Sequence, residues 1–130
     1  MPDSGALTTT GTLTAGNVIT TGRGSAANYA ETVHTFGNAT GTITPNISLG
    51  AIQRLTLTGN ITLNSITNIL SGQSMTLILT QDATGNRTLT STWKFGGGSK
   101  TLSTTGNTTD IVSVFYDGTT YWAVLSKGFV

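Results

Sequence analysis

The residues that could take part in catalysis are few in this chain. Its single histidine, His34, lies in a segment that alternates polar and apolar residues, and the sequence contains no cysteine. A nucleophilic site would therefore need a serine placed beside His34 and an acid. No nucleophile-elbow sequence supports such a triad. We interpret His34 as a structural or exposed residue and predict that the chain is not an enzyme.

The acidic residues are also too dispersed to indicate a metal or hydrolase site. They are Asp3, Glu31, Asp82, Asp110 and Asp117. None forms the Asp-x-Asp pattern of a calcium loop. Two carboxylates brought together by folding could hydrolyse glycosides, but Asp82 and Asp117 stand at turn positions, where a carboxylate caps neighbouring N–H groups. We favour the turn interpretation and expect no metal.

The glycine-rich stretch 96–100 superficially resembles a phosphate-binding loop because it ends in Ser-Lys. It lacks the Gly-x4-Gly-Lys-Ser/Thr spacing, and no helix is expected after it. We interpret it as a hinge or a tight bulged loop and expect no cofactor. The net charge of +1 provides no field that would attract nucleic acid or an anionic membrane, and we expect neither as a partner.

The aromatic residues are the best candidates for binding. Trp93, Tyr121 and Trp122 could stack on sugars if their rings are exposed. The alternative is that they fill the core or a subunit interface, where aromatic side chains carry much of the burial energy. Because neighbours on a strand point to opposite faces, Tyr121 and Trp122 cannot both point inward. We take these three residues as candidate glycan or interface aromatics.

The composition indicates that strands and turns must position any such surface. Thr, Gly, Ser and Asn make up 66 of the 130 residues, and only 8% of the residues are charged. Threonine suits a pleated strand, whereas glycine, asparagine and serine favour turns. Good helix formers are scarce, so sustained helix is not expected. The chain is therefore predicted to be all-β.

Strand patterns begin near residue 31. Alternating apolar residues predict a strand over 51–58, a central strand over 74–81, and a last hairpin over 111–127 that turns at Asp117-Gly118. Short strands are expected over 32–36 and 41–44, a hairpin turn at 84–86, and a further strand over 88–92. Residues 66–70 fit either a helical turn or a wide loop. We predict an antiparallel β-sandwich or jelly-roll-like domain over residues 31–130, preceded by an extended N-terminal arm over residues 1–30.

A short pattern recurs three times, as Thr-Gly-Thr-Leu-Thr at 10–14, Thr-Gly-Thr-Ile-Thr at 40–44 and Thr-Gly-Asn-Ile-Thr at 58–62. The spacing between the copies is unequal, whereas a solenoid needs a constant period. We interpret the pattern as shared strand–turn chemistry rather than as a repeat architecture.

The C-terminal half resembles the C-terminal β-modules of tailed-bacteriophage virion structural proteins, namely capsid decoration (cement) proteins and tail fibres. The stretches that carry the resemblance are 72–77, 81–88, 93–97, 102–105, 110–114, 116–118 and 121–122. The resemblance implies a homotrimeric β-fold without enzymatic activity. It also implies a component of the virion, assembled in the host cytoplasm.

Two roles fit this resemblance. We favour a trimeric cement protein on the capsid surface that stabilises the head shell by binding the phage major capsid protein. A chain of 130 residues that starts at its own Met1 leaves no room for a tail-attachment domain and a long shaft, and an ordered arm needs a partner. The candidate capsid or trimer contacts are the apolar residues of the arm, Leu7, Leu13, Val18, Ile19 and Tyr29.

The alternative is a short tail fibre or receptor-binding tip that recognises host surface glycan. Its expected sign is exposure of Trp93, Tyr121 or Trp122 at the distal end of the molecule. A bacterial adhesin-like module is a weaker third interpretation, because the sequence starts without a secretion signal.

Overall fold

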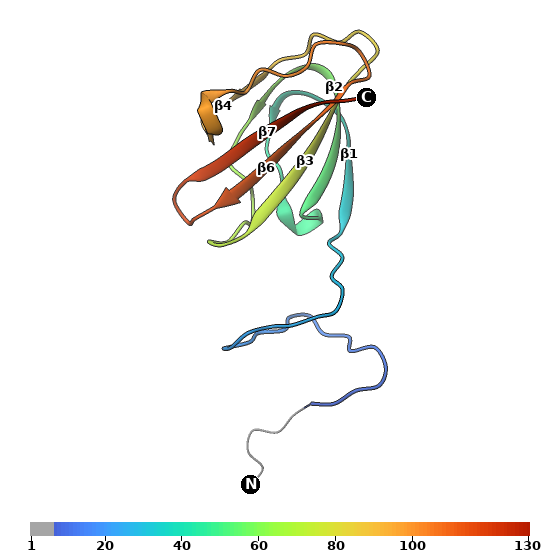
Figure 1. Ribbon diagram of the computed structural model, residues 1–130, viewed down its shortest axis with the longest axis vertical. Helices are drawn as coiled ribbons and strands as arrows, with labels where there is room; N and C mark the ends of the chain where they lie inside the picture. Colours follow the sequence, from blue (N-terminus) through green and yellow to red (C-terminus); the bar gives the residue numbers. More distant parts are fainter. Residues whose placement is uncertain (1–6) are drawn as a thin grey trace.

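The computed structural model describes residues 7–130 and confirms the all-β prediction (Figure 1). The strands are β1 (Val33–Ile43), β2 (Ile52–Leu63), β3 (Ser74–Gln81), β4 (Leu89–Ser91), β5 (Lys94–Phe95), β6 (Thr109–Tyr116) and β7 (Tyr121–Phe129). Two short 3₁₀ helices complete the elements, η1 (Ile47–Leu49) and η2 (Gly96–Gly98). The sheet has the order β1-β2-β3-β6-β7-β5, and β4 pairs with β2 outside this path.

The first three long strands are parallel, which corrects the prediction of an antiparallel domain. Val33 pairs with Ile52, and Ile52 pairs in turn with Thr76, so β1, β2 and β3 run side by side in one direction. After each of β1 and β2 the chain returns behind the sheet and starts the next strand beside the last. The result is a short solenoid-like stack of flattened coils, an architecture that the unequal spacing of the recurring pattern had argued against.

Strands β1 and β2 bend sharply where each coil passes from the front layer to the back layer. The pairing moves from Ala39 beside Leu57 to Gly41 beside Ile61. Residues 58–60 of β2 therefore lie opposite a single residue of β1, which is a β-bulge geometry that bends the strand. Beyond the bend, β2 pairs with β4 in the back layer. The two short strands expected at 32–36 and 41–44 are thus one bent strand.

The last hairpin was predicted correctly. Strands β6 and β7 are antiparallel, and β6 also pairs with β3, so β3 is central as expected. The hairpin predicted at 84–86 is wrong, because β3 and β4 do not pair with each other and the turn carries the chain from the front layer to the back. A short segment then leads to β5, which pairs with β7 as the last strand in the sheet order.

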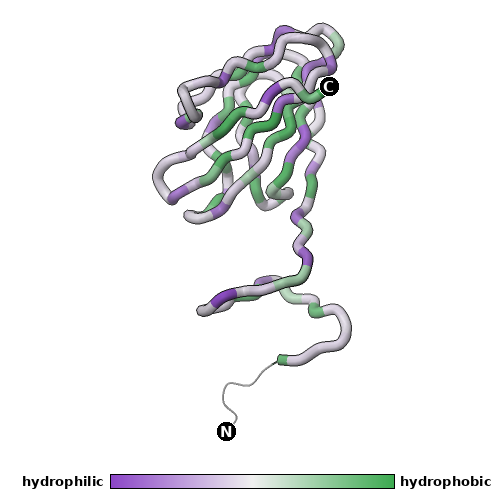
Figure 2. Tube along the Cα trace, in the orientation of Figure 1, coloured by the Kyte–Doolittle hydropathy of each residue, from purple (hydrophilic) through white to green (hydrophobic). Residues whose placement is uncertain are grey.

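The core lies between the two layers and follows the alternation of the strands. Figure 2 shows the apolar residues concentrated along the strands of the body, whereas the arm is mostly polar. The buried hydrophobic residues are Ala39, Ile43, Leu55, Leu57, Ile61, Leu63, Ile66, Met75, Leu77, Leu79, Leu89, Trp93, Phe95, Leu102, Val112, Val114 and Ala123. Three large polar side chains, Gln53, Gln81 and Asp110, occupy inward positions among them.

The body has two ends, which we call the arm end and the far end. At the arm end, β1 begins after the arm, and the backbone N–H of Gly72 donates to the carbonyl of Tyr116 beside the β6–β7 turn. At the far end, the loop 82–88 meets the loop 104–108, and the backbone N–H of Asn86 donates to the carbonyl of Thr104. The β6–β7 turn therefore lies on the side where the arm enters, and the C-terminus lies at the opposite end (Figure 1).

Residues 7–32, which include the described part of the arm, contain neither helix nor strand, and all of them are exposed. The arm runs away from the body rather than along it (Figure 1). Within residues 7–130, no helix has the length and apolar character needed to cross a membrane.

Candidate functional site

Three aromatic rings form a stack beside the β6–β7 hairpin. The ring centroids of Tyr116 and Tyr121 lie 4.6 Å apart, and those of Tyr121 and Trp93 lie 5.4 Å apart, both in stacked orientation. The hydroxyl oxygen of Tyr121 also accepts a hydrogen bond of 3.2 Å from the backbone N–H of Ile66. This stack joins the hairpin to the returning leg of the second coil and is a structural element of the body.

The stack decides the role of two of the three candidate aromatics. Trp93 is only 4% exposed and belongs to the core, so it is not available to a glycan. Tyr121 is half-buried, and its ring lies between two other aromatic rings. Trp93 as a candidate for sugar contact is therefore corrected: its position between the layers gives it a packing role.

Trp122 is the candidate aromatic that lies on the surface. Its side chain is on the outer face of the sheet and is 49% exposed. It pairs across the hairpin with Phe115, which is 44% exposed. The indole Nε1–H donates a 3.0 Å hydrogen bond to Oδ2 of Asp117. The ring is therefore held in one orientation while much of its surface stays open.

Asp117 organises this end of the hairpin. Its Oδ1 accepts hydrogen bonds from the backbone N–H groups of Thr119 and Thr120, at 2.8 and 2.7 Å. The Thr120 N–H, the indole of Trp122 and the Thr119 N–H together lower the pKa of Asp117, since each bond favours the charged carboxylate. The turn predicted from Asp117-Gly118 therefore also fixes the aromatic surface next to it.

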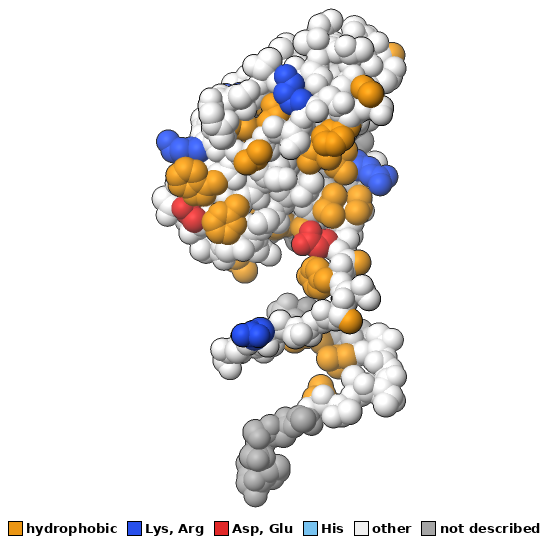
Figure 3. Space-filling view, viewed as in Figure 1, with side chains coloured by type: hydrophobic (Ala, Val, Ile, Leu, Met, Phe, Trp, Pro, Cys, Tyr) orange, Lys and Arg blue, Asp and Glu red, His pale blue; other side chains and the backbone are white. Residues whose placement is uncertain are grey.

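A shallow groove extends from Trp122 along the outer face of the sheet. Its floor and walls are mostly apolar, and they include Phe115, Trp122, Val124, Ser113, Thr76 and Lys94. Figure 3 shows aromatic and aliphatic side chains gathered on this side of the body, with a few charged groups at the edge. An indole face beside hydroxyl groups can stack on the apolar face of a sugar and hydrogen-bond its hydroxyls.

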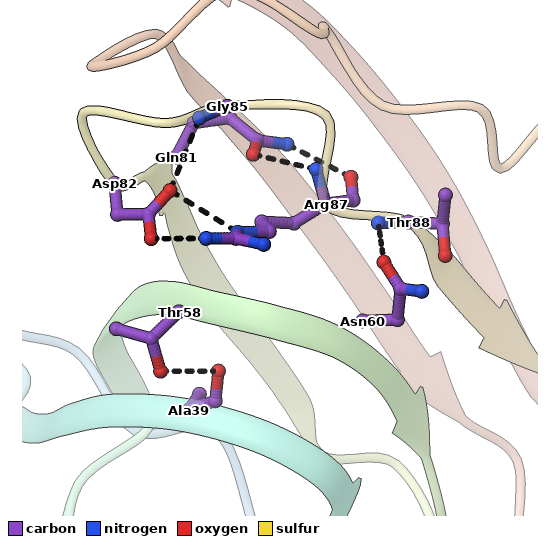
Figure 4. Close-up of polar contacts among 8 residues, drawn as sticks. All are labelled: Ala39, Thr58, Asn60, Gln81, Asp82, Gly85, Arg87 and Thr88. Carbon is purple, nitrogen blue, oxygen red and sulfur yellow. Dashed lines mark hydrogen bonds and ion pairs between the residues drawn. The ribbon is translucent and has the colours of Figure 1, made fainter.

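The far end carries a polar cluster around the loop 82–88 (Figure 4). Arg87 forms a two-pronged ion pair with Asp82, with Nε to Oδ1 at 3.1 Å and Nη2 to Oδ2 at 2.7 Å. The hydrogen bond from Arg87, together with that from the backbone N–H of Gly85, lowers the pKa of Asp82 against the opposing effect of desolvation. Asp82 therefore has a local structural role, as its turn position predicted.

Sequence analysis missed the buried polar residues that organise these loops. Gln81 donates to the carbonyls of Arg87 and Ser103, both at 2.9 Å, and its Oε1 accepts from the N–H of Arg87. Asp110 accepts from the N–H and hydroxyl of Ser103 and from the N–H of Gly128. The sequence did carry a signal for both residues, because each is a polar residue at an inward-facing position of a strand whose residues alternate.

The five arm residues proposed as capsid or trimer contacts are all exposed. Their exposed fractions range from 54% for Leu13 to 88% for Ile19, and Leu7, Val18 and Tyr29 lie between these values. Tyr29 also lines a shallow hollow with η1 where the arm joins the body. These residues stay predicted contacts.

Comparison with known proteins found one family. Residues 42–121 match the family model described as "Putative phage tail fibre C-terminal domain". This match runs from the end of β1 to the first residue of β7 and includes the aromatic stack, whereas Trp122 lies just beyond it. No curated protein and no solved structure matches the chain.

Proposed function

The chain belongs to the phage tail fibre C-terminal domain family, and we propose that it is a receptor-binding module of a tail fibre that recognises saccharide on the host surface. Membership of this family makes the protein a structural component of a phage virion. It also favours the tail-fibre interpretation over the capsid cement protein that sequence analysis had put first.

The observation that carries the proposal is the exposed, fixed indole of Trp122. A ring that must stack on a sugar gains affinity when its orientation is set before binding, because less conformational freedom is lost. Asp117 sets that orientation through the 3.0 Å bond to Nε1. Phe115 extends the apolar platform on the neighbouring strand.

The surroundings of the ring support a neutral or weakly charged saccharide. The hydroxyl groups of Thr76 and Ser113 line the same groove, and Lys94 is the basic residue at its edge. Hydroxyls can donate to and accept from sugar hydroxyls. A single lysine would suit an acidic sugar at one end of the groove.

The position of the groove defines how the fibre would meet its receptor. The groove lies on the side of the body, and the β6–β7 turn beside it lies at the arm end rather than at the far end. The saccharide would therefore be bound laterally, along the flank of the module, and not by its outermost loops.

The experiment is binding of the purified full chain to an array of bacterial surface oligosaccharides. We expect Trp122→Ala to weaken binding at least tenfold, which corresponds to about 1.4 kcal/mol. The matched control is Phe129→Ala, which removes an aromatic side chain of 50% exposure near the far end. A wild-type chain that binds no oligosaccharide, or a Trp122→Ala variant that binds as well as wild type, would contradict the glycan role.

The tail location is tested separately by the number of copies in each purified virion. A few to some dozens of copies, measured by quantitative mass spectrometry, are expected for a tail fibre. Hundreds of copies would place the protein on the head shell and would contradict the tail-fibre assignment without bearing on saccharide binding.

A further inference from the structure

The stack of coils ends on one side in an unpaired strand. Strand β1 is the first in the sheet order, and among the described residues its pairing partner is β2 alone. A strand of 11 residues therefore presents a free edge. Such an edge offers unpaired N–H and C=O groups to any extended chain that lies beside it.

The recurring pattern explains how neighbouring coils fit together. Its copies at 40–44 and 58–62 lie side by side at the bends of β1 and β2, offset by two residues, so that Gly41 pairs with Ile61 and Thr42 with Thr62. A Cβ on Gly59 would collide with the side chain of Thr40 in the coil above. The glycine of one coil is therefore the site into which the threonine of the next coil packs.

The corresponding site on the outer coil is open. Gly41 is the glycine of the pattern in β1, and no atom lies within 4 Å of the position that its Cβ would take. The stack is thus built to accept one more coil whose threonine would pack onto Gly41. The third copy of the pattern, Thr10-Gly11-Thr12-Leu13-Thr14, lies in the arm.

The arm has the properties of a chain that pairs elsewhere. Residues 10–14 are exposed and belong to no strand. The hydrogen bonds recorded within residues 7–30 are local, from the N–H of Gly11 to Thr9 and from Thr20 to the carbonyl of Gly22. Because the arm runs away from its own body (Figure 1), it can reach a neighbouring molecule.

We infer that residues 10–14 of a second copy add a parallel rung to the free edge of β1, with the same offset that β1 keeps to β2. Thr10 then packs onto Gly41, Thr12 lies beside Thr44, and Leu13 faces inward as Ile43 does in β1. Each copy gives one arm and receives another, so the contact is head-to-tail, and it forms a ring where the rotation between neighbouring copies closes. A ring of three copies would agree with the homotrimer that the resemblance to virion proteins implies. This assembly does not depend on saccharide binding.

The natural absence of cysteine allows a direct test by cross-linking. Two single variants of the full chain, Thr12→Cys and Thr44→Cys, are mixed, unfolded, refolded together and oxidised, with a small tag on one of them. Neighbouring residues of adjacent strands are close enough for a disulfide. We expect a covalent mixed dimer on a non-reducing gel, with at least a tenfold excess over the control pair.

The control pair is Thr12→Cys with Thr62→Cys. Thr62 pairs with Thr42 on the inner side, so it lies one coil further from the free edge and beyond disulfide reach of the proposed rung. A mixed dimer from Thr12→Cys and Thr44→Cys alone supports the inference. No mixed dimer, or equal amounts from both pairs, overturns it.

A double variant shows whether the arm that lies beside β1 comes from the same chain or from another copy. If Thr12→Cys/Thr44→Cys forms a disulfide within one chain while the mixed single variants do not cross-link, the arm folds back on its own body and the inference is overturned. Light scattering gives an independent measurement: the full chain is expected at the mass of three 13.4-kDa copies, and Leu13→Asp is expected to shift it towards the single copy. An unchanged mass for Leu13→Asp, with the body folded by circular dichroism, also counts against the rung.

Discussion

Replacing Gln81 with leucine should lower the free energy of unfolding by more than most single substitutions do. Gln81 is 2% exposed, at the end of β3. Its amide satisfies three backbone groups, the carbonyls of Arg87 and Ser103 and the N–H of Arg87, each at 2.9 Å. Leucine fills a similar volume but offers no partner to any of them.

The magnitude follows from the groups left unpaired. Each buried polar group without a partner costs about 1–3 kcal/mol. Arg87 is only partly buried, so water can reach some of the vacated space, and we expect a loss of about 3–5 kcal/mol in the free energy of unfolding. With a slope of about 2 kcal/mol/M, the urea midpoint should fall by about 2 M.

The assay is urea unfolding followed by circular dichroism and by tryptophan fluorescence, at one protein concentration for all variants. The matched control is Gln73→Leu, because Gln73 is exposed and its side chain accepts one hydrogen bond, from the N–H of Leu70. We expect the control to cost at most about 1 kcal/mol. A loss of less than about 1 kcal/mol for Gln81→Leu would refute the view that this side chain joins the loops of the far end.

Two further predictions concern the bend and the far-end ion pair. Gly59→Ala should destabilise the body by about 1–3 kcal/mol in urea unfolding, because the added Cβ meets Thr40. Adding Thr40→Ala should recover part of that loss, and the control Gly96→Ala should cost little because the nearest atoms to its added Cβ lie 3.9 Å away or more. A Gly59→Ala variant as stable as wild type would be inconsistent with tight coil packing. Because the pKa of Asp82 is lowered, its contribution to stability is complete above the ordinary carboxyl pKa of about 4 and is lost as the pH falls through the lowered value. The melting temperature should therefore fall less between pH 7 and pH 2 in Asp82→Asn than in wild type, whereas parallel profiles would argue against the ion pair.

The sequence predicted individual strands better than their partners. Alternation at 74–81 and around Asp117-Gly118 located β3 and the β6–β7 hairpin, because a two-residue period reports which faces are buried. Alternation carries no information on whether the neighbouring strand is parallel. The turn residues at 84–86 were read as a hairpin, but the turn there leads to another layer, where β4 meets β2.

The coil architecture was hidden by coils of unequal length. The step from Val33 to Ile52 is shorter than the step from Ile52 to Thr76, so no constant period appears in the sequence. The coils share a recurring sequence only at the bend, where Thr40 of one copy of the five-residue pattern packs against Gly59 of the next. A pattern of five residues was too short to separate a stacked coil from ordinary turn chemistry.

The candidate site was located in part. Trp122 was named from its residue type and proves to be on the surface, whereas Trp93 is in the core. Residue type alone could not separate them, but Trp93 lies on an alternating run in which Leu89, Ser91, Trp93 and Phe95 are buried and the residues between them are exposed. This signal for its inward face was therefore present in the sequence and was missed. Phe115 became visible as part of the groove only when the hairpin register placed it beside Trp122.

The placement of the two chain ends has a mechanical consequence. Strand β1 leaves the arm at one end of the sheet, and β7, which runs in the same direction on the other side, finishes at the opposite end (Figure 1). A pull between the arm and the C-terminus therefore acts along the strands. Since the ladder hydrogen bonds lie across that direction, such a load is shared by many bonds in shear and does not open them one after another.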